Sequence, residues 1–302
     1  MLITFIFVTF SSEIYYMKAF FLLFVVLILS SSSVNKQKSD LDKENLKGNV
    51  KSLRQVSFYA VEKFGAITKG KRGGESLIES NDFHNKYNEK GFLIERNSYL
   101  DGTLYLIEIY TYDDNDNNIE VFQSTSEGEN GKVIYNYDDK GNLIEENSYY
   151  PDDSLKASYK YTNKYDNNDN LIEQNTYLSN GSLSWREIYT YDKNGKLIEN
   201  NKYQSNGSFD NKDTFKYDNN GYLIEITRYL PDSSLYYKDR YIYDEKGNPI
   251  ERNYDRPSDG KFTTSFKDTY QYDYDEKNNW IKKVHFKDKI PKHIIEREIK
   301  YY

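Results

Sequence analysis

The sequence predicts an all-β repeat protein, a long antiparallel β-meander of about nine hairpins in a coiled or curled sheet. Three observations support this fold class. A Leu-Ile-Glu-like segment recurs along most of the chain, apolar and polar residues alternate with period two between the copies, and tyrosine is abundant, with 32 Tyr and 16 Phe among 302 residues. Aromatic side chains suit the half-buried surface of a strand, and disordered chains are poor in them. We therefore expect a folded, strand-rich chain.

The repeat is visible in the spacing of one isoleucine per copy. These residues are Ile94, Ile119, Ile144, Ile172, Ile198, Ile224, Ile250 and Ile281. A degenerate first copy stands at residues 48–53, and a basic insertion around residues 63–75 separates it from the rest. Because no other kind of sequence follows residue 48, we expect one tyrosine-rich hairpin-repeat domain over residues 48–302, preceded by a linker over residues 34–47.

Each copy contains two turns. The first begins with Asp and has Gly at its fourth position, as in residues 192–195 and 218–221, which is typical of a type I turn. Where the glycine is missing, Asp116, Asp169 or Asn278 stands in its place, and these residue types tolerate a left-handed backbone. The second turn is Asp-Gly or Asn-Gly in several copies, dipeptides that favour tight hairpins, and Pro-Asp in two others. Each copy is thus expected to form two antiparallel strands.

The rings are expected to lie on one face of the sheet, which coils with that face inward. Counting back in steps of two from the tyrosine before the first turn gives mainly aromatic residues, and mostly polar residues lie between them. If each hairpin bulges only at the turn glycine, Tyr217 pairs with Leu223 and Phe215 faces Glu225. The aromatic face then also carries carboxylates, including Glu199 and Glu225. We expect tyrosine hydroxyls to satisfy them, with a partly wet face as the alternative, and a row of Lys and Arg on the opposite face.

Residues 1–33 have the layout of a secretory signal peptide. One positive residue, Lys18, precedes an apolar stretch over residues 19–29, and a run of serines follows. Residues 1–16 contain no positive charge, so Met17 is the expected true start. The apolar stretch is shorter than the ~20 residues of a spanning helix, which favours cleavage, with an uncleaved anchor as the alternative. We expect an exported protein, periplasmic, on the outer surface or secreted, without a stable membrane span after cleavage.

Composition excludes several functional classes. The formal net charge of −7 argues against nucleic acid as a partner, because phosphate binding requires clustered basic residues. The chain has no cysteine, which excludes disulfides and thiolate metal sites, and it has only three histidines. Known catalytic motifs are absent, and the same acids recur in every copy, whereas catalysis requires one differentiated pair. We expect no enzyme activity, no cofactor and no bound metal.

One short string carries a family resemblance. Tyr-x-Tyr-Asp-x-x-Gly-x-Leu occurs at residues 135–143 and 189–197, and with Phe in the first position at residues 215–223. It resembles the YD repeat of the Rhs/YD-repeat family, whose repeats build long antiparallel β-strips that spiral into shells in large secreted or surface proteins. The resemblance covers nearly all of residues 76–300, although the usual Arg after the turn glycine is replaced, for example by Lys196. It implies a short exported protein with YD-like repeats.

Two non-enzymatic functions fit these features. The first is a structural or protein-interaction scaffold at the cell envelope, in which the rings form only the core. The alternative is a carbohydrate- or peptide-binding surface protein, because rings interspersed with hydrogen-bonding groups suit such ligands. The expected partner is accordingly a protein or a glycan at the cell envelope. The candidate ligand-binding residues are Trp185, Tyr189, Tyr191, Tyr217, Tyr241, Tyr243, Glu199 and Glu225.

Overall fold

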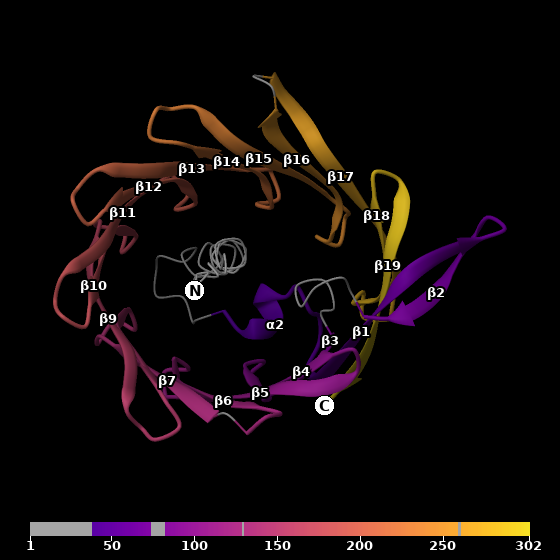
Figure 1. The fold of residues 1–302 in the computed structure, drawn as a ribbon, viewed down its shortest axis with the longest axis horizontal. Coiled ribbons are helices and arrows are strands. Elements are labelled where there is room, and N and C mark those ends of the chain that lie inside the picture. Colours follow the sequence, from indigo (N-terminus) through magenta and orange to yellow (C-terminus); the bar gives the residue numbers. More distant parts are fainter. Residues whose placement is uncertain (1–37, 74–81, 129, 259–260) are drawn as a thin grey trace, which may run out of the picture.

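The chain folds into a closed antiparallel β-barrel (Figure 1). The structure is a computed structural model, and it describes residues 38–73, 82–128, 130–258 and 261–302. The predicted all-β class and antiparallel pairing are confirmed. The expected signal peptide over residues 1–33, with Met17 as its start, lies outside the described residues.

The described part of the chain contains one short helix, α2 (Asp40–Lys43), and a sheet of 19 strands. The strands are β1 (Val50–Lys63), β2 (Ala66–Arg72), β3 (Asp82–Tyr87), β4 (Leu93–Leu100), β5 (Thr103–Tyr112), β6 (Asn118–Thr125), β7 (Asn130–Tyr137), β8 (Leu143–Tyr149), β9 (Leu155–Tyr165), β10 (Leu171–Leu178), β11 (Leu183–Tyr191), β12 (Leu197–Gln204), β13 (Phe209–Tyr217), β14 (Leu223–Tyr229), β15 (Leu235–Tyr243), β16 (Pro249–Ser258), β17 (Lys261–Tyr274), β18 (Trp280–Lys287) and β19 (Ile290–Tyr301).

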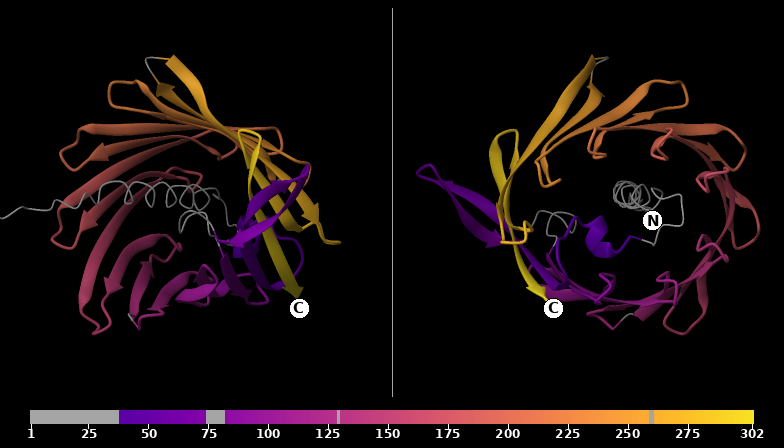
Figure 2. Two further views of the ribbon diagram at one scale, coloured as in Figure 1. Left: turned by 45° about the vertical axis from the view of Figure 1, so that its right-hand side comes forward. Right: turned by 180° about the vertical axis from the view of Figure 1, so that it is seen from behind.

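The first and last strands close the ring. Along one edge β1 pairs with β19, from Val50 with Tyr301 to Tyr59 with His293. Along its other edge β1 pairs first with β3, through residues 52–55, and then with β2. β2 therefore lies outside the ring of 18 strands, and the β1–β2 hairpin projects from the wall (Figure 1, Figure 2). The expected coiled repeat of about nine hairpins is corrected to a closed barrel, because the two ends of the meander pair with each other.

A register shift in each repeat bends the sheet. In the hairpin of β13 and β14, Tyr217 pairs with Leu223 but Lys216 pairs with Glu225, so Ile224 is an extra residue without a partner. The same shift occurs in the equivalent hairpins around the ring. Such an extra residue is a β-bulge, which bends its strand and increases the local twist. Repeated bulges supply the curvature that closure of a barrel requires.

The predicted acidic turns are confirmed. In the turn after β11, the Gly195 N–H donates to the Asp192 carbonyl at 3.0 Å, and Gly195 has a φ of +77°. The Asp192 carboxylate accepts hydrogen bonds from the backbone N–H groups of Asn194 and Lys196. The bond from Lys196 is the main cause that lowers the pKa of Asp192. The same left-handed conformation occurs in the copies without glycine, at Asp116, Asp169 and Asn278.

A segment inside the ring ties together turns from both sides of the β1–β19 seam (Figure 1). On one side, the Leu41 N–H donates to the carbonyl of Gly91, in the turn between β3 and β4. On the other side, the Asn45 side chain donates to the Lys246 carbonyl at 2.9 Å. The backbone of residue 47 exchanges two further hydrogen bonds with the side chain of Asn279. Residues 41–47 therefore connect, through hydrogen bonds, three turns at one end of the barrel, which contain Gly91, Lys246 and Asn279.

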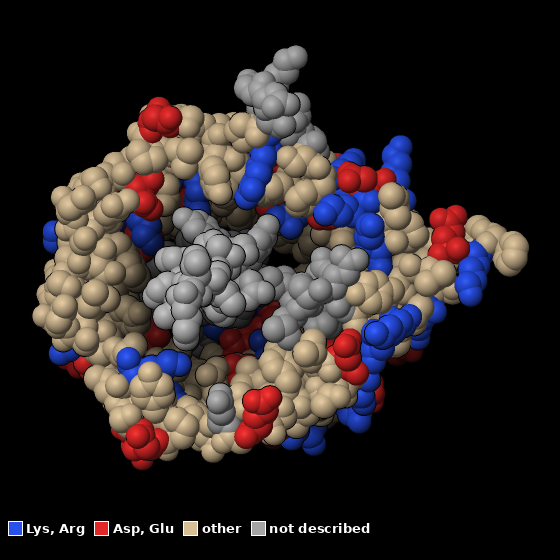
Figure 3. All heavy atoms as spheres, viewed as in Figure 1, with Lys and Arg blue, Asp and Glu red and all other residues tan. Residues whose placement is uncertain are grey.

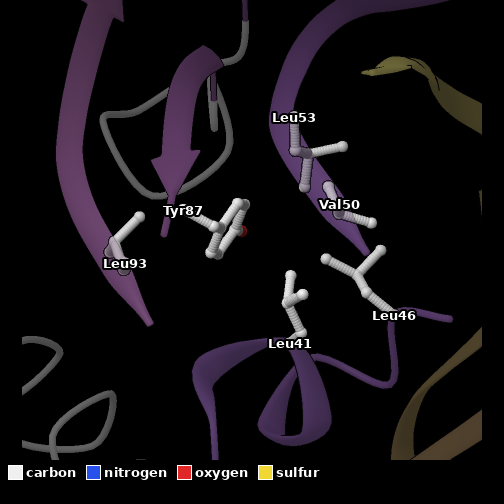
Figure 4. Packing of buried hydrophobic residues seen from close by; sticks show 6 residues of the cluster. All are labelled: Leu41, Leu46, Val50, Leu53, Tyr87 and Leu93. Atoms are coloured by element: carbon white, nitrogen blue, oxygen red, sulfur yellow. The ribbon is translucent and has the colours of Figure 1, made fainter. Parts of the chain in front are cut away.

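The same segment covers the main apolar cluster of the wall. The cluster consists of Leu41, Leu46, Val50, Leu53, Tyr87 and Leu93 (Figure 4). The described residues of the expected linker are therefore packed against β1, β3 and β4, and Ser39 caps the N-terminus of their helix α2. Because α2 lies within the ring, this cluster also shows which face of the sheet points inward.

A glycine substitution tests the backbone conformation of the turns. Gly207 has a φ of +81°, and a Cβ atom there would meet no atom within 4 Å. Gly207→Ala therefore probes backbone strain alone, and we expect the free energy of unfolding to fall by about 1–2 kcal/mol. Gly207→Asn is the control, with a smaller loss, because Asn adopts the left-handed region more readily. Urea unfolding followed by circular dichroism measures both, and an Ala variant as stable as the parent contradicts the assigned turn.

Candidate functional site

The aromatic face predicted from the sequence forms the inner wall of the barrel. Tyr87 of β3 and Leu93 of β4 pack in the cluster under α2, so their side chains point inward. Residues that pair in register share a face of the sheet, so the inward face can be followed from strand to strand. Tyr189 is buried, and the other aromatic candidates are half-buried. Following the register around the ring places all of these on the inner wall: Trp185, Tyr189, Tyr191, Tyr217, Tyr241 and Tyr243.

A tyrosine near the end of the first strand of most repeats binds the neighbouring hairpin through its hydroxyl group. The Tyr217 hydroxyl in β13 donates to the Leu197 carbonyl in β12 at 2.9 Å. Leu197 is the residue directly before the extra isoleucine of its own hairpin. Equivalent bonds of 2.7–2.8 Å join Tyr112 to Leu93, Tyr137 to Asn118, Tyr191 to Leu171, Tyr243 to Leu223 and Tyr272 to Pro249.

These hydroxyl bonds join neighbouring hairpins at positions beyond the last pair of the backbone ladder. The ladder between β12 and β13 stops at Glu199 with Thr214, so Leu197 and Tyr217 lie beyond it. A bulge disrupts the ladder locally, and buried backbone groups there need other partners. The tyrosine hydroxyl is such a partner, and it ties each hairpin to the preceding one beside the bulge. Three of the six aromatic candidates thus donate to backbone carbonyls of the wall.

Burial raises the pKa of these tyrosines. The pKa of Tyr217 rises to about 12, first because burial disfavours the phenolate and then because of the nearby charge of Asp192. The pKa of Tyr243 also rises to about 12, where the charges of Asp218 and Asp239 add to the effect of burial. The folded barrel therefore favours the neutral hydroxyl, which is the form that can donate to a carbonyl.

Glu199 and Glu225 do not lie on the inner wall, so this part of the prediction is wrong. The extra isoleucine before each of them reverses the side on which the next side chain points, and the glutamate faces outward. Glu225 lies 2.8 Å from Lys216 and 3.5 Å from Lys238. Glu199 lies 3.6 Å from Lys212. Both carboxylates are therefore partners of the basic row on the outer wall.

The outer wall repeats this pairing of glutamate with the basic row. Side chains of both signs are spread around the rim of the ring (Figure 3). Single exposed pairs contribute little stability, at most about 1 kcal/mol each, so the array matters chiefly as a hydrated, charged surface. The equivalent pairs are Lys86 with Glu95, Lys160 with Glu145, Lys164 and Arg186 with Glu173, and Lys267 with Glu251.

Two carboxylates on the inner wall, Asp213 and Asp239, are held by arginine. Arg228 donates two hydrogen bonds to Asp213, of 2.7 and 2.6 Å, and Arg252 holds Asp239 in the same manner. Tyr241 also donates to Asp239 at 3.0 Å. The expectation that tyrosine hydroxyls satisfy the inner carboxylates is confirmed only in part. Both arginines follow the glutamate of their repeat by one to three residues. The bulge before this glutamate was not predicted from the sequence, so the inward orientation of the arginines was not predicted either.

Sequence reasoning also missed a cationic part of the inner wall in the last two strands. Lys283 in β18 pairs in register with Tyr272, and Arg297 in β19 pairs with Gln55 of β1. Both cations lie beside the ring of Trp280. The final hairpin departs from the repeat pattern, and its neighbour β1 is set by ring closure. No local sequence signal marks this group.

The histidines of the last hairpin stack on the inner wall. The rings of His285 and His293 are 5.7 Å apart, and a ring nitrogen of His285 lies 2.8 Å from Asp268. Within the ranges that the structure describes, no three or more His, Asp or Glu side chains are grouped so that they could hold a metal ion. In the same ranges, no helix has the length and apolar character needed to cross a membrane.

The comparisons find similar chains among solved structures but no matching family. No protein family and no curated protein matches it. Among solved structures it is similar to a porin-like protein from Bacteroides uniformis ATCC 8492, with 10% identity and a TM-score of 0.39 over 84% of this chain and 99% of that chain. A porin-like protein from Bacteroides vulgatus ATCC 8482 has 12% identity and a TM-score of 0.33 over 85% and 99%. The structure of TcdB2-TccC3-TEV has 12% identity and a TM-score of 0.27 over 76% of this chain and 16% of that chain.

TM-scores this low do not assign the chain to a family. The resemblance to the Rhs/YD-repeat family therefore stays a prediction from the sequence.

Removing one tyrosine hydroxyl tests its role as a link between hairpins. Tyr217→Phe keeps the ring but deprives the Leu197 carbonyl of its donor, so we expect the free energy of unfolding to fall by about 1–2 kcal/mol. Tyr229→Phe is the matched control, because Tyr229 lies on the outer wall under Lys212. Its expected change is within about 0.5 kcal/mol. Urea unfolding measures both variants, and equal losses would show that the hydroxyl bond does not link the hairpins.

The raised tyrosine pKa predicts a loss of stability at high pH. An unfolded tyrosine loses its proton near pH 10, whereas Tyr217 in the barrel keeps its proton to about pH 12. Between these values the unfolded state binds fewer protons than the folded state, so the free energy of unfolding falls as pH rises. We expect full stability from this source below pH 10 and a decreasing urea midpoint above it. A urea midpoint that stays constant through this window is the contrary result.

Proposed function

We propose that this chain is a non-enzymatic exported protein that serves as a structural or protein-interaction scaffold at the cell envelope. The observation that carries the proposal is the position of the repeat tyrosines. Their hydroxyl groups donate to carbonyls of neighbouring hairpins, as those of Tyr191 and Tyr217 do. Their aromatic side chains line the inner wall of the barrel. The most regular feature of the sequence therefore holds the barrel together, as expected when repeats stack to bury their faces.

The outer wall supports the same proposal. Its strands carry ion pairs such as Lys164 with Glu173 at 2.9 Å and Lys267 with Glu251 at 2.7 Å. Charged side chains at these positions favour contact with water, since transferring them into hydrocarbon is costly. A wide array of both signs also offers a protein partner a surface for complementary charges. An exported scaffold needs such a hydrated surface.

The inner carboxylates support a role without catalysis. A catalytic pair requires two groups in different environments, at least one of which can reach a substrate. Asp213 and Asp239 instead occupy equivalent positions in successive repeats, and an arginine fork binds each of them. Both carboxylates have arginine as their partner, and Asp239 also accepts a hydrogen bond from Tyr241. Their arrangement is that of a structural group repeated along the wall.

A second function, binding of a carbohydrate or peptide in the lumen, is favoured by one observation. Trp185 lies on the inner wall, the Lys202 ammonium stands 4.6 Å from the centre of its ring, and Tyr159 lies 6.3 Å away. Neighbouring rings and a cation are a common composition of ligand sites. This function would use Trp185 and Tyr189 rather than the tyrosines bonded to the wall.

Two measurements separate these functions. For a scaffold we expect no rise in melting temperature with libraries of neutral glycans or peptides. A photo-crosslinker at Ile242, which is 50% exposed on the outer wall, should join a neighbouring protein in the native envelope, whereas one at the inner residue Tyr189 should not. A glycan-induced rise that is lost in Trp185→Ala, without cross-links from Ile242, would instead establish binding in the lumen and overturn the scaffold.

A further inference from the structure

Two cations share one aromatic ring on the inner wall. The guanidinium carbon of Arg297 lies 3.5 Å from the ring centre of Trp280, and the Lys283 ammonium lies 5.0 Å from the same centre. Tyr270 is a second ring near Lys283, at 5.6 Å. Tyr272 lies 5.9 Å from Trp280 and adds a third ring to the group. The group belongs to β17, β18 and β19, next to the seam of the barrel.

Neither cation forms an ion pair with a described residue. The Nε of Arg297 donates to the uncharged side chain of Gln55 at 2.9 Å. The carboxylate of Glu44 acts on Arg297 from beyond ion-pair distance, and it is already bonded to Tyr87 at 3.2 Å and lies 3.8 Å from Arg96. Positive charge therefore exceeds negative charge in this part of the wall.

The surroundings disfavour the charged forms of both groups. Burial lowers the pKa of Lys283 to about 8, and the charge of Arg297 adds to the effect. Burial likewise lowers the pKa of Arg297, to about 10, against the attraction of Glu44. Cation–π contacts with Trp280 offset only part of the cost of removing a charge from water. A counter-ion bound between the two cations would offset more of it.

We propose that Lys283 and Arg297 form a binding site for a carboxylate anion on the inner wall. Lysine contributes an ammonium with three N–H donors, and arginine contributes a planar fork whose geometry matches the two carboxylate oxygens. A carboxylate that contacts both groups supplies the negative charge that the wall lacks. It also gives hydrogen-bond acceptors to the Lys283 ammonium and to the N–H groups of Arg297 other than Nε, which donates to Gln55.

The three rings indicate the rest of the ligand. Aromatic side chains bind the flat, apolar faces of organic molecules, including the C–H faces of sugars. Trp280, Tyr270 and Tyr272 lie within reach of a molecule whose carboxylate is held by the cations. The ligand class is therefore a carboxylate on a compact organic frame, of which a uronic acid is the simplest sugar example. An inorganic anion would leave the rings without a contact.

This site does not depend on the scaffold role, because a ligand inside the ring leaves the charged outer wall unchanged. It would give the second candidate function a ligand class. Cross-linking from the outer wall and binding in the lumen are measured separately, so either proposal can fail without the other.

Calorimetric titration of the full chain tests the site. We expect glucuronate to bind with one molecule per chain and glucose not to bind. Lys283→Met removes the charge but keeps an unbranched side chain, and we expect it to weaken glucuronate binding at least about tenfold. Lys282→Met is the matched control, because Lys282 lies on the outer wall of the same strand, 3.7 Å from Asp273, and should leave the affinity unchanged.

The melting temperature of the ligand-free protein gives a second readout. Because Lys283 lacks a counter-ion, Lys283→Met should leave this temperature unchanged or raise it, while only the parent chain gains stability from glucuronate. A structural lysine would show the opposite, with a lower melting temperature and no gain from glucuronate in the parent. That result, or equal binding of glucose and glucuronate, overturns the proposal.

Acetylglutamate carries a carboxylate on an amino-acid frame and tests the source of the ligand. Binding of both acetylglutamate and glucuronate, lost together in Lys283→Met, supports a carboxylate site that accepts either frame. Binding of glucuronate alone supports a sugar acid, and binding of acetylglutamate alone supports an acidic peptide or amino acid. Binding of inorganic sulfate with neither organic acid overturns the site, because the rings would then have no part in it.

Discussion

The extra isoleucine in each repeat, together with the tyrosine bond beside it, is the constraint on which the rest of the barrel depends. The bulge bends every second strand, and the bends add up to a closed ring. It also interrupts the ladder, which ends at Glu199 between β12 and β13. The Tyr217 hydroxyl then donates to the Leu197 carbonyl, so the point of greatest distortion is also a point of attachment between hairpins. The bulge therefore both curves the sheet and provides the carbonyl through which neighbouring hairpins are joined.

The bulge also separates the charges of the two faces. One added residue places Glu225 outside, between Lys216 and Lys238, and not among the rings. The inner wall is left with tyrosines and with acids held by arginine or by neutral donors, such as Asp213 with Arg228 and Glu187 with Asn200. The glutamates therefore meet their basic partners on the outer wall. A regular register would have put the glutamates of successive repeats into an aromatic wall, where unpaired carboxylates are costly.

The parts that the sequence predicts are those with a local signal. The acidic turns were predictable because Gly195, and Asp169 at the equivalent position of another copy, are residue types that adopt a left-handed backbone. The aromatic face was predictable from the alternation of aromatic and polar residues with period two. The outward position of Glu199 was not, because no Gly or Pro marks the bulge within Leu-Ile-Glu. Closure was not predictable either, since it depends on pairing between the two ends of the chain, such as Val50 with Tyr301.

The seam between β1 and β19 differs from the regular repeats in the charges on its inner wall. Around most of the ring each strand meets another copy of the repeat, and inner charges meet partners, as Arg252 meets Asp239. At the seam β19 meets β1, which is not a regular copy, and Arg297 faces the uncharged Gln55. A wall built only for stability gains nothing from Lys283 and Arg297 beside one another without an acid. At this break in the repeat, two neighbouring cations stand beside one ring without an acid as an ion-pair partner, and a bound anion explains that arrangement better than the demands of the fold.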